Sequence, residues 1–303
     1  MKKIKFLLYP FFFFVAVLFV SCKQSEAKKS KETIIKGKTV LLVDETIKPL
    51  IEDQIAVFEN TYDAKIILEA KSEKELMQAF LKDTSRIVVL SRQLSVDEAK
   101  FFEQLNIKPR VTKIATDAIA LISNKKDADT LIAMKDVVAF LKGSAGTKIK
   151  GLVFDNPNSS TVRFMTTLAG LKEVSHKGVY SFKSNEEVVK FVSENDGMIG
   201  VIGVNWLLQP TVNIKDYLTN INVLSVQGLN KNSYFAPTQN NLAEGTYPLA
   251  RDLFIINCQG YSGLGMGFAS FLAGEIGQRI VLKSGMLPTK MPGRKILIKS
   301  RIK

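Results

Sequence analysis

From Lys38 onward, short apolar runs alternate with longer segments in which apolar residues recur every three or four positions. The short runs predict buried strands at 39–43, 64–68, 87–90, 114–123, 151–154, 199–202 and 248–257. The periodic segments predict helices at 47–62, 71–81, 95–105, 134–141, from 159 onward, 185–195 and 264–282. Strands and helices that alternate in this way form mostly parallel sheets with helices on both faces. We therefore predict an α/β fold.

Two of the strand patterns are long and appear to connect separate units. The strand at 114–123 leaves the first strand–helix unit, and the strand at 248–257 returns to it. This order predicts a hinged clamshell of two lobes joined by two crossing strands. Lobe I is predicted to comprise 38–115 and 253–303, and lobe II 116–252. Ligands of such sheets bind at the carboxyl ends of the strands, which here face each other across a cleft that can close.

Three predicted strand-to-helix junctions contain hydrogen-bond donors. The donors are Thr46 at the first junction, Ser91 and Arg92 at the second, and Ser159, Ser160, Thr161 and Arg163 at the third. Helix N-termini, hydroxyl groups and guanidinium groups together can bind a tetrahedral oxyanion. Any one of these residues is also typical of an ordinary helix cap or a solvated loop. Donors at all three junctions favour an oxyanion site.

The first 21 residues have the pattern of an export signal. A lysine-rich start is followed by an apolar run over 6–20, which is shorter than the roughly 20 residues that span a bilayer. We therefore predict a cleavable signal peptide at 1–21.

A small residue, Ser21, stands directly before Cys22, which resembles a bacterial lipoprotein signal. The resemblance implies that Cys22 is lipidated, that 22–37 is a flexible tether, and that the protein lies on the periplasmic side of a bacterial membrane. Phe19 departs from the leucine that is usual at that place. Cleavage near Ser21 without lipid attachment is the alternative.

The chain has two cysteines, so lipid on Cys22 would leave only Cys258 and exclude a disulfide within the chain. Cys258 lies in an apolar run, where a buried thiol is expected. The core must then hold the fold together, for which about 280 mature residues suffice.

The chain is basic, with a net charge of +13 that falls to +10 when the three lysines of the signal are removed. Many of the basic residues lie in the tether and the C-terminal tail. They are not interleaved with aromatic residues, and no nucleic-acid-binding motif is present. We therefore expect no nucleic-acid partner and contact with the membrane only through the lipid.

An enzyme is the main alternative of another class. Ser159 or Ser160 could act as a nucleophile only beside a base, and His176, the only histidine, lies in a loop-like segment typical of the surface. No cysteine–histidine cluster has metal-binding spacing, and the glycine-rich segment 260–267 lacks the Lys-Ser/Thr of a nucleotide loop. We predict no catalytic residue, cofactor or metal.

Four motifs resemble those of the phosphate-binding proteins of bacterial high-affinity phosphate ABC importers, within the type II periplasmic-binding-protein superfamily. They are Asn158-Ser-Ser-Thr-Val162, Asn195-Asp-Gly-Met-Ile-Gly-Val-Ile202, Tyr247-Pro-Leu-Ala-Arg251, and Phe271-Leu-Ala-Gly-Glu-Ile-Gly-Gln278 with Gly285 and Pro288. Their order spans nearly the whole mature chain. The resemblance implies that the anion is contacted by Thr46, Ser91, Ser159, Ser160 and Thr161.

The chain departs from this family at two charged positions. Arg92 stands where relatives commonly have an acidic residue, whose carboxylate accepts the proton of hydrogen phosphate and so rejects sulfate. Asp155 lies near the place of an arginine that usually precedes the phosphate loop, and Arg163 is a candidate replacement. Asp44 and Asp117 are candidate proton acceptors.

The sequence therefore predicts a monomeric, lipid-anchored solute-binding protein that captures inorganic phosphate and delivers it to ABC permease subunits. Loop hydroxyls and helix N-termini would hold the anion, while Arg92 and Arg163 would balance its charge. The alternatives are a binding protein for sulfate or another oxyanion, a phosphate-sensing lipoprotein without transport, and a serine-dependent hydrolase.

Overall fold

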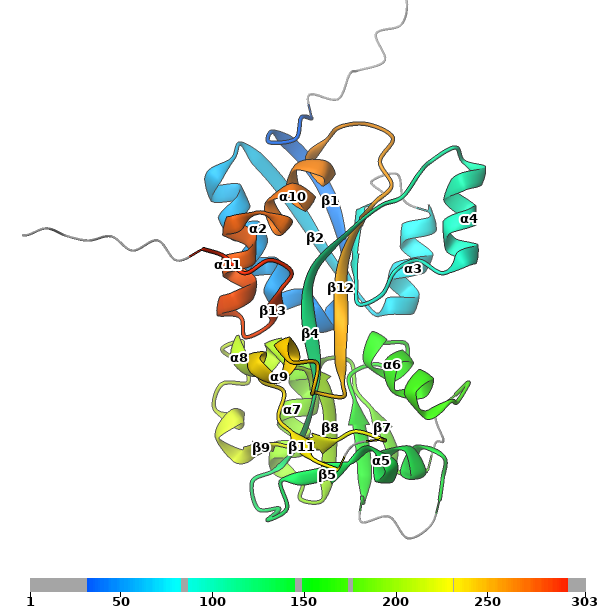
Figure 1. The fold of residues 1–303 in the computed structure, drawn as a ribbon, viewed down its shortest axis with the longest axis vertical. Helices are drawn as coiled ribbons and strands as arrows, with labels where there is room; N and C mark the ends of the chain where they lie inside the picture. Colours follow the sequence, from blue (N-terminus) through cyan, green and yellow to red (C-terminus); the bar gives the residue numbers. More distant parts are fainter. Residues whose placement is uncertain (1–31, 83–86, 145–148, 174–176, 231, 294–303) are drawn as a thin grey trace, which may run out of the picture. The chain divides into compact units, whose positions relative to one another are not determined.

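The structure is a computed structural model that describes residues 32–82, 87–144, 149–173, 177–230 and 232–293 (Figure 1). The predicted signal peptide, Cys22 and His176 lie outside the described residues, as do most of the predicted tether and the end of the basic tail.

The strands include every strand predicted from the sequence and several shorter ones. They are β1 (Gly37–Asp44), β2 (Ala64–Lys71), β3 (Ile87–Leu90), β4 (Arg110–Asn124), β5 (Leu131–Ala133), β6 (Gly151–Phe154), β7 (Val179–Ser181), β8 (Met198–Gly203), β9 (Ile221–Val223), β10 (Ser225–Gln227), β11 (Tyr234–Phe235), β12 (Ala250–Asn257) and β13 (Leu287–Pro288).

The helices include those predicted from the sequence, with one exception, and several short ones that the sequence pattern does not predict. They are η1 (Glu45–Ile47, a 3-10 turn), α2 (Lys48–Thr61), α3 (Glu73–Lys82), α4 (Val96–Gln104), α5 (Met134–Leu141), α6 (Ser160–Ala169), α7 (Asn185–Glu194), α8 (Asn205–Leu208), η2 (Tyr217–Asn220), α9 (Gln239–Ala243), α10 (Leu264–Ala273) and α11 (Glu275–Lys283). The single helix predicted at 264–282 is wrong, because the extended backbone of Gly274 ends α10 and begins α11.

Most of the strands form one sheet in the order β2-β1-β3-β12-β4-β8-β6-β7, in which β9 and β13 also pair with β4, and β11, β10 and β5 form a separate three-stranded sheet. Pairing is parallel among β1, β2 and β3, and again among β6, β7 and β8. The long strands β4 and β12 pair antiparallel to each other, and β4 continues beyond β12 to pair with β8 (Figure 1). The two predicted crossing strands are confirmed.

We call β1–β3 with α2–α4, α10 and α11 the first lobe, and β5–β11 with α5–α9 the second lobe. The predicted boundary residues of the lobes stay a prediction.

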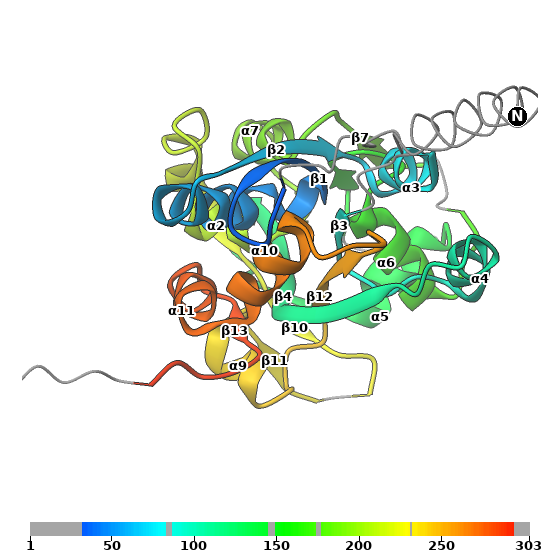
Figure 2. The ribbon, with the colours of Figure 1, turned by 90° about the horizontal axis from the view of Figure 1, so that it is seen from above.

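Helices cover both faces of the sheet in the first lobe, as the alternation of elements predicts (Figure 2). Along β1, Leu41 and Val43 belong to one buried apolar cluster, which includes residues of α2 and α10. Leu42, which points to the opposite face, belongs to a second cluster with residues of α3 and α4 and with Cys258. Cys258 is fully buried, as expected, and forms no disulfide with another described residue. Among the residues that the structure describes, none of the helices combines the length and the apolar character needed to cross a bilayer.

The turn between α10 and α11 generates a test of packing. A Cβ on Gly277 would lie 2.4 Å from the Phe271 carbonyl oxygen and 2.7 Å from the Leu272 Cα, both of which are backbone atoms. Replacing glycine by alanine inside a helix normally stabilises by about 1 kcal/mol. Here we expect Gly277→Ala to lower the free energy of unfolding by about 1–3 kcal/mol, because the backbone must move. Urea denaturation measures this, and Gly260→Ala, which meets nothing within 4 Å, is the control.

Candidate ligand-binding site

The carboxyl end of β1 places Thr46 inside the molecule. Asp44 Oδ1 accepts hydrogen bonds from the Thr46 backbone N–H at 3.1 Å and from Thr46 Oγ1 at 2.9 Å. Both residues are fully buried. The aspartate therefore caps the 3-10 turn that follows the strand and fixes the direction of the threonine hydroxyl.

The junction between β6 and α6 places three hydroxyl groups at the start of a helix. Ser159 is the N-cap of α6, and its Oγ accepts a hydrogen bond from the Val162 N–H at 3.3 Å. The Ser159 and Thr161 hydroxyl oxygens lie 2.7 Å apart, and Thr161 donates to Asp155 Oδ1 at 2.7 Å. Ser159 thus begins the helix that the sequence predicts from 159 onward, and Asp155 holds Thr161 in place.

The two junctions meet at a buried arginine of β12. Arg251 donates from Nη1 to Ser160 Oγ at 2.9 Å and from Nη2 to Thr46 Oγ1 at 3.1 Å, and these two hydroxyl oxygens lie 3.0 Å apart. Asp117 of β4 receives bonds from Arg251 Nε at 3.0 Å and Nη2 at 2.9 Å. We call Asp44, Thr46, Asp117, Ser160 and Arg251 the inner cluster, which joins both lobes and both crossing strands.

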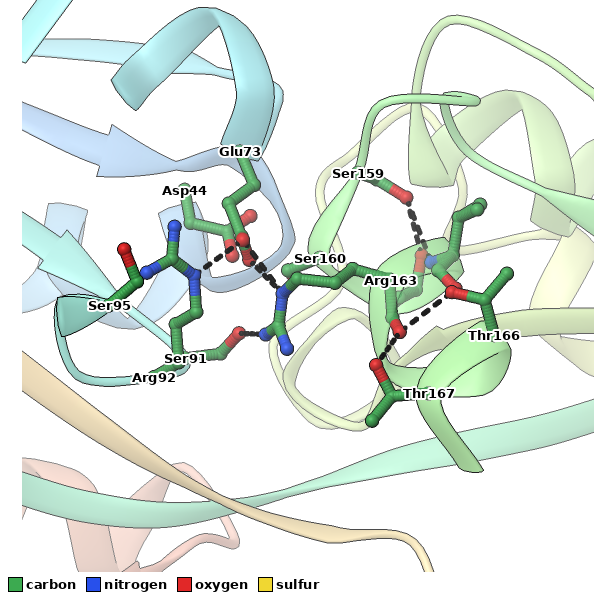
Figure 3. A network of polar contacts seen from close by, with 12 residues as sticks. Asp44, Glu73, Ser91, Arg92, Ser95, Ser159, Ser160, Arg163, Thr166 and Thr167 are labelled. Carbon is green, nitrogen blue, oxygen red and sulfur yellow. Dashed lines mark hydrogen bonds and ion pairs between the residues drawn. The ribbon is translucent and has the colours of Figure 1, made fainter. Parts of the chain in front are cut away.

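A second set of charged residues joins α3, α4, α6 and the loop after β3 (Figure 3). Glu73 Oε1 accepts from Arg92 Nε at 2.7 Å, and Glu73 Oε2 accepts from Arg163 Nε at 2.8 Å. Arg92 also forms two bonds to the Glu98 carboxylate, and Arg163 Nη2 donates to Ser91 Oγ at 3.4 Å. We call Glu73, Ser91, Arg92, Glu98 and Arg163 the outer cluster.

The single tryptophan of the sequence joins the second lobe to the loop that carries Thr46. The Trp206 Nε1–H donates to the Thr46 carbonyl oxygen at 3.0 Å. A Cβ on Gly203 would lie 2.9 Å from the same oxygen, so a glycine at the end of β8 permits this close approach. Trp206 is buried, so it packs in the core while its hydrogen bond positions the Thr46 loop.

The inner cluster contains carboxylates with unused oxygens. Asp44 Oδ2 and Asp117 Oδ1 are buried and have no hydrogen-bond partner among the described residues. Burial raises the pKa of both carboxyl groups, and the Arg251 charge opposes that shift. A buried acceptor beside a guanidinium and two hydroxyls can receive a proton or hydrogen bond from an oxyanion that retains a proton. Among the described residues, no group of three potential ligands is arranged to hold a metal ion.

The structure divides the predicted site residues into three groups. Thr46 and Ser160 meet in the inner cluster, and Ser159 and Thr161 lie beside it. The remaining predicted residues, Ser91, Arg92 and Arg163, lie in the outer cluster. Both candidate proton acceptors, Asp44 and Asp117, lie in the inner cluster.

Sequence reasoning missed Arg251 and Glu73. In the sequence Arg251 ends the Tyr-Pro-x-x-Arg motif, and the signal that marks it is its place inside a buried strand pattern, where an arginine is almost always paired. Glu73 follows β2 at a fourth strand-to-helix junction, where the same reasoning applied to the other three junctions would have found it.

A family model described as a PBP superfamily domain matches residues 28–275. None of the curated proteins compared matches the chain. Similar solved structures include a protein from Clostridium perfringens, described as a phosphate ABC transporter substrate-binding protein with bound phosphate. Its sequence is 19% identical, and the two structures superpose with a TM-score of 0.67 over 84% of this chain and 100% of that one. An ABC-type phosphate transport receptor from Vibrio cholerae is 15% identical with a TM-score of 0.63, over 83% and 100% of the two chains.

The same fold occurs outside transport. The regulatory domain of CcmR from Synechocystis PCC6803, solved in complex with 2-PG, is 13% identical with a TM-score of 0.52, over 78% of this chain and 96% of that one. At these identities the structural matches establish the fold.

The residue before Thr46 generates a prediction about pH. Burial, followed by the charges of Asp155 and Asp44, raises the pKa of Glu45 to about 7 from an ordinary value of 4.5. At pH values between 4.5 and 7 the folded protein keeps a proton on Glu45 that the unfolded chain loses. The free energy of unfolding should therefore fall as pH rises from 4.5 to 7, and the contribution of Glu45 should change little above pH 7. Glu45→Gln should flatten this dependence in denaturant titrations. Glu103→Gln, at an exposed position of α4, is the control and should not flatten the dependence.

Proposed function

The chain belongs to the PBP superfamily, and from that premise we propose that it is an extracytoplasmic solute-binding protein that captures inorganic phosphate between its lobes. The captured phosphate would be delivered to an ABC importer. A lipid on Cys22 would anchor the protein on the periplasmic side of a bacterial membrane, and the protein would act as a monomer.

One observation carries the proposal: two hydroxyl groups from different lobes lie 3.0 Å apart and share a buried arginine. Thr46 follows β1, and Ser160 is the first residue of α6. Closure of the lobes thus brings neutral donors, a helix N-terminus and a guanidinium to one point away from water. These are the groups that hold an oxyanion when bulk water is excluded.

The unused carboxylate oxygens favour phosphate over sulfate. Hydrogen phosphate can donate a hydrogen bond to a carboxylate through the proton that it retains, whereas sulfate has no proton through which to donate at neutral pH. Asp44, whose Oδ1 already fixes the Thr46 hydroxyl, has a buried Oδ2 for this purpose. We therefore assign to Asp44 the role of acceptor that Arg92 cannot perform, with Asp117 holding Arg251.

The inner cluster supports binding rather than hydrolysis. Ser160 lies between the Thr46 hydroxyl and the Arg251 guanidinium. An arginine stays protonated in proteins and a neutral hydroxyl is a very weak base, so neither of these two partners can take the serine proton as a general base would. Similar structures solved as phosphate-binding transport proteins agree with a binding role.

Calorimetric titration of the purified protein with phosphate, followed by sulfate, tests the proposal. We expect one phosphate per chain and no displacement by excess sulfate. Thr46→Val and Ser160→Ala should each weaken phosphate binding at least about tenfold, because each removes a hydrogen bond to a charged ligand. Ser270→Ala, whose hydroxyl bonds only a carbonyl oxygen within α10, is the control.

Each other result has a defined meaning. Displacement of phosphate by sulfate would assign the site to a different oxyanion and remove the role of Asp44. Failure of both anions to bind would reject phosphate capture. Co-purification with the permease subunits separates transport from sensing, since a sensor forms no complex with them that depends on phosphate.

A further inference from the structure

Glu73 lies where the two arginines of the outer cluster converge. It is the first residue of α3, and 4% of its surface is exposed. Its Oε1 lies 2.7 Å from Nε of Arg92, which belongs to the first lobe, and 2.7 Å from Nε of Arg163, which belongs to the second (Figure 3). The carboxylate therefore connects the lobes through charge-assisted bonds.

The two arginines differ in how strongly they depend on Glu73. Arg92 also binds the Glu98 carboxylate through both terminal nitrogens, so it keeps an anionic partner if Glu73 is removed. For Arg163, the other side-chain contact described is the neutral hydroxyl of Ser91. Loss of the Glu73 charge would therefore release mainly Arg163.

Arg163 faces space that a solute can occupy. It lines a cavity of about 820 Å³ together with Glu73 and Arg92, and a second cavity of about 480 Å³ together with Ser91 and Arg251. The second cavity is thus lined by one arginine of the outer cluster and by the arginine of the inner cluster. An oxyanion that enters the second cavity would contact Arg163. Glu73, which lines the first cavity, binds the guanidinium group of the same arginine.

We propose that Glu73 is an internal anion that competes with the bound oxyanion for Arg163 and so sets the affinity of the cleft. The inference rests on the proposed function, because it assumes an oxyanion as the solute. A carboxylate presents two oxygens to a guanidinium much as an oxyanion does, and a like charge so near disfavours a second anion. A second hydrogen bond joins α3 to the loop before α6: the Lys74 N–H donates to the Asn158 carbonyl oxygen at 3.2 Å. This bond keeps the neighbouring Glu73 in place.

The test is phosphate titration of the whole protein and its Glu73→Gln variant. The amide keeps the size of the side chain but removes the charge, so phosphate should bind at least about tenfold more tightly. Glu98→Gln, which removes the other carboxylate on Arg92 without touching Arg163, should change affinity less than about twofold. In the Glu73→Gln background, Arg163→Gln should abolish the gain.

The outcomes separate this inference from the proposed function. Unchanged or weaker binding by Glu73→Gln, or an equal gain with Glu98→Gln, would overturn the role of Glu73 while leaving phosphate capture intact. Binding by Glu73→Gln but not by the unaltered protein would support the role of Glu73 and reject phosphate capture by the natural chain. Binding by neither would reject both. If Glu73→Gln does not fold, Glu73→Asp withdraws the carboxylate from Arg163 and should give a smaller gain.

Discussion

The buried ion pair between Arg251 and Asp117 is the interaction on which the arrangement of the site depends. Its members lie on the two crossing strands, β12 and β4, which are paired in register at these residues. A buried pair is costly unless its remaining donors find partners, and truncating either member leaves an uncompensated charge. The remaining donors of Arg251 reach Thr46 and Ser160, so the requirement to satisfy one guanidinium draws both lobes to one point.

The charges of the cleft are largely balanced within the protein. Each of Arg92, Arg163 and Arg251 contacts a carboxylate. A surplus of positive charge in the cleft therefore does not explain the anion binding that we propose. The hydroxyl groups and the α6 N-terminus supply neutral donors, which can hold an oxyanion without creating a permanent field that would resist its release.

Local patterns were enough to predict β1–β3, α2–α4 and the two crossing strands. The α10–α11 break was missed because the apolar spacing continues across Gly274, and only its extended backbone ends the helix. Between 205 and 249 the elements are two to five residues long. Such short elements show neither the helical spacing of apolar residues nor the alternation typical of strands. Thr46 and Ser160 could be predicted because both stand at strand ends. Arg251 lies within a strand, and its side chain reaches the site only because β12 pairs with β4 beside Asp117. A single sequence does not reveal this pairing.

The glycine at the end of β8 has a consequence for the range of solutes. At Gly203 the loop after β1 approaches through the main-chain carbonyl oxygen of Thr46, which lies beside the Asn205 side chain. Main-chain positions cannot adjust by changing rotamer, so the width of the closed cleft is a fixed property of the fold. The charge preference that we propose, by contrast, lies in side chains such as Glu73. Sequence variation in this architecture can therefore retune which charge is accepted far more readily than which size.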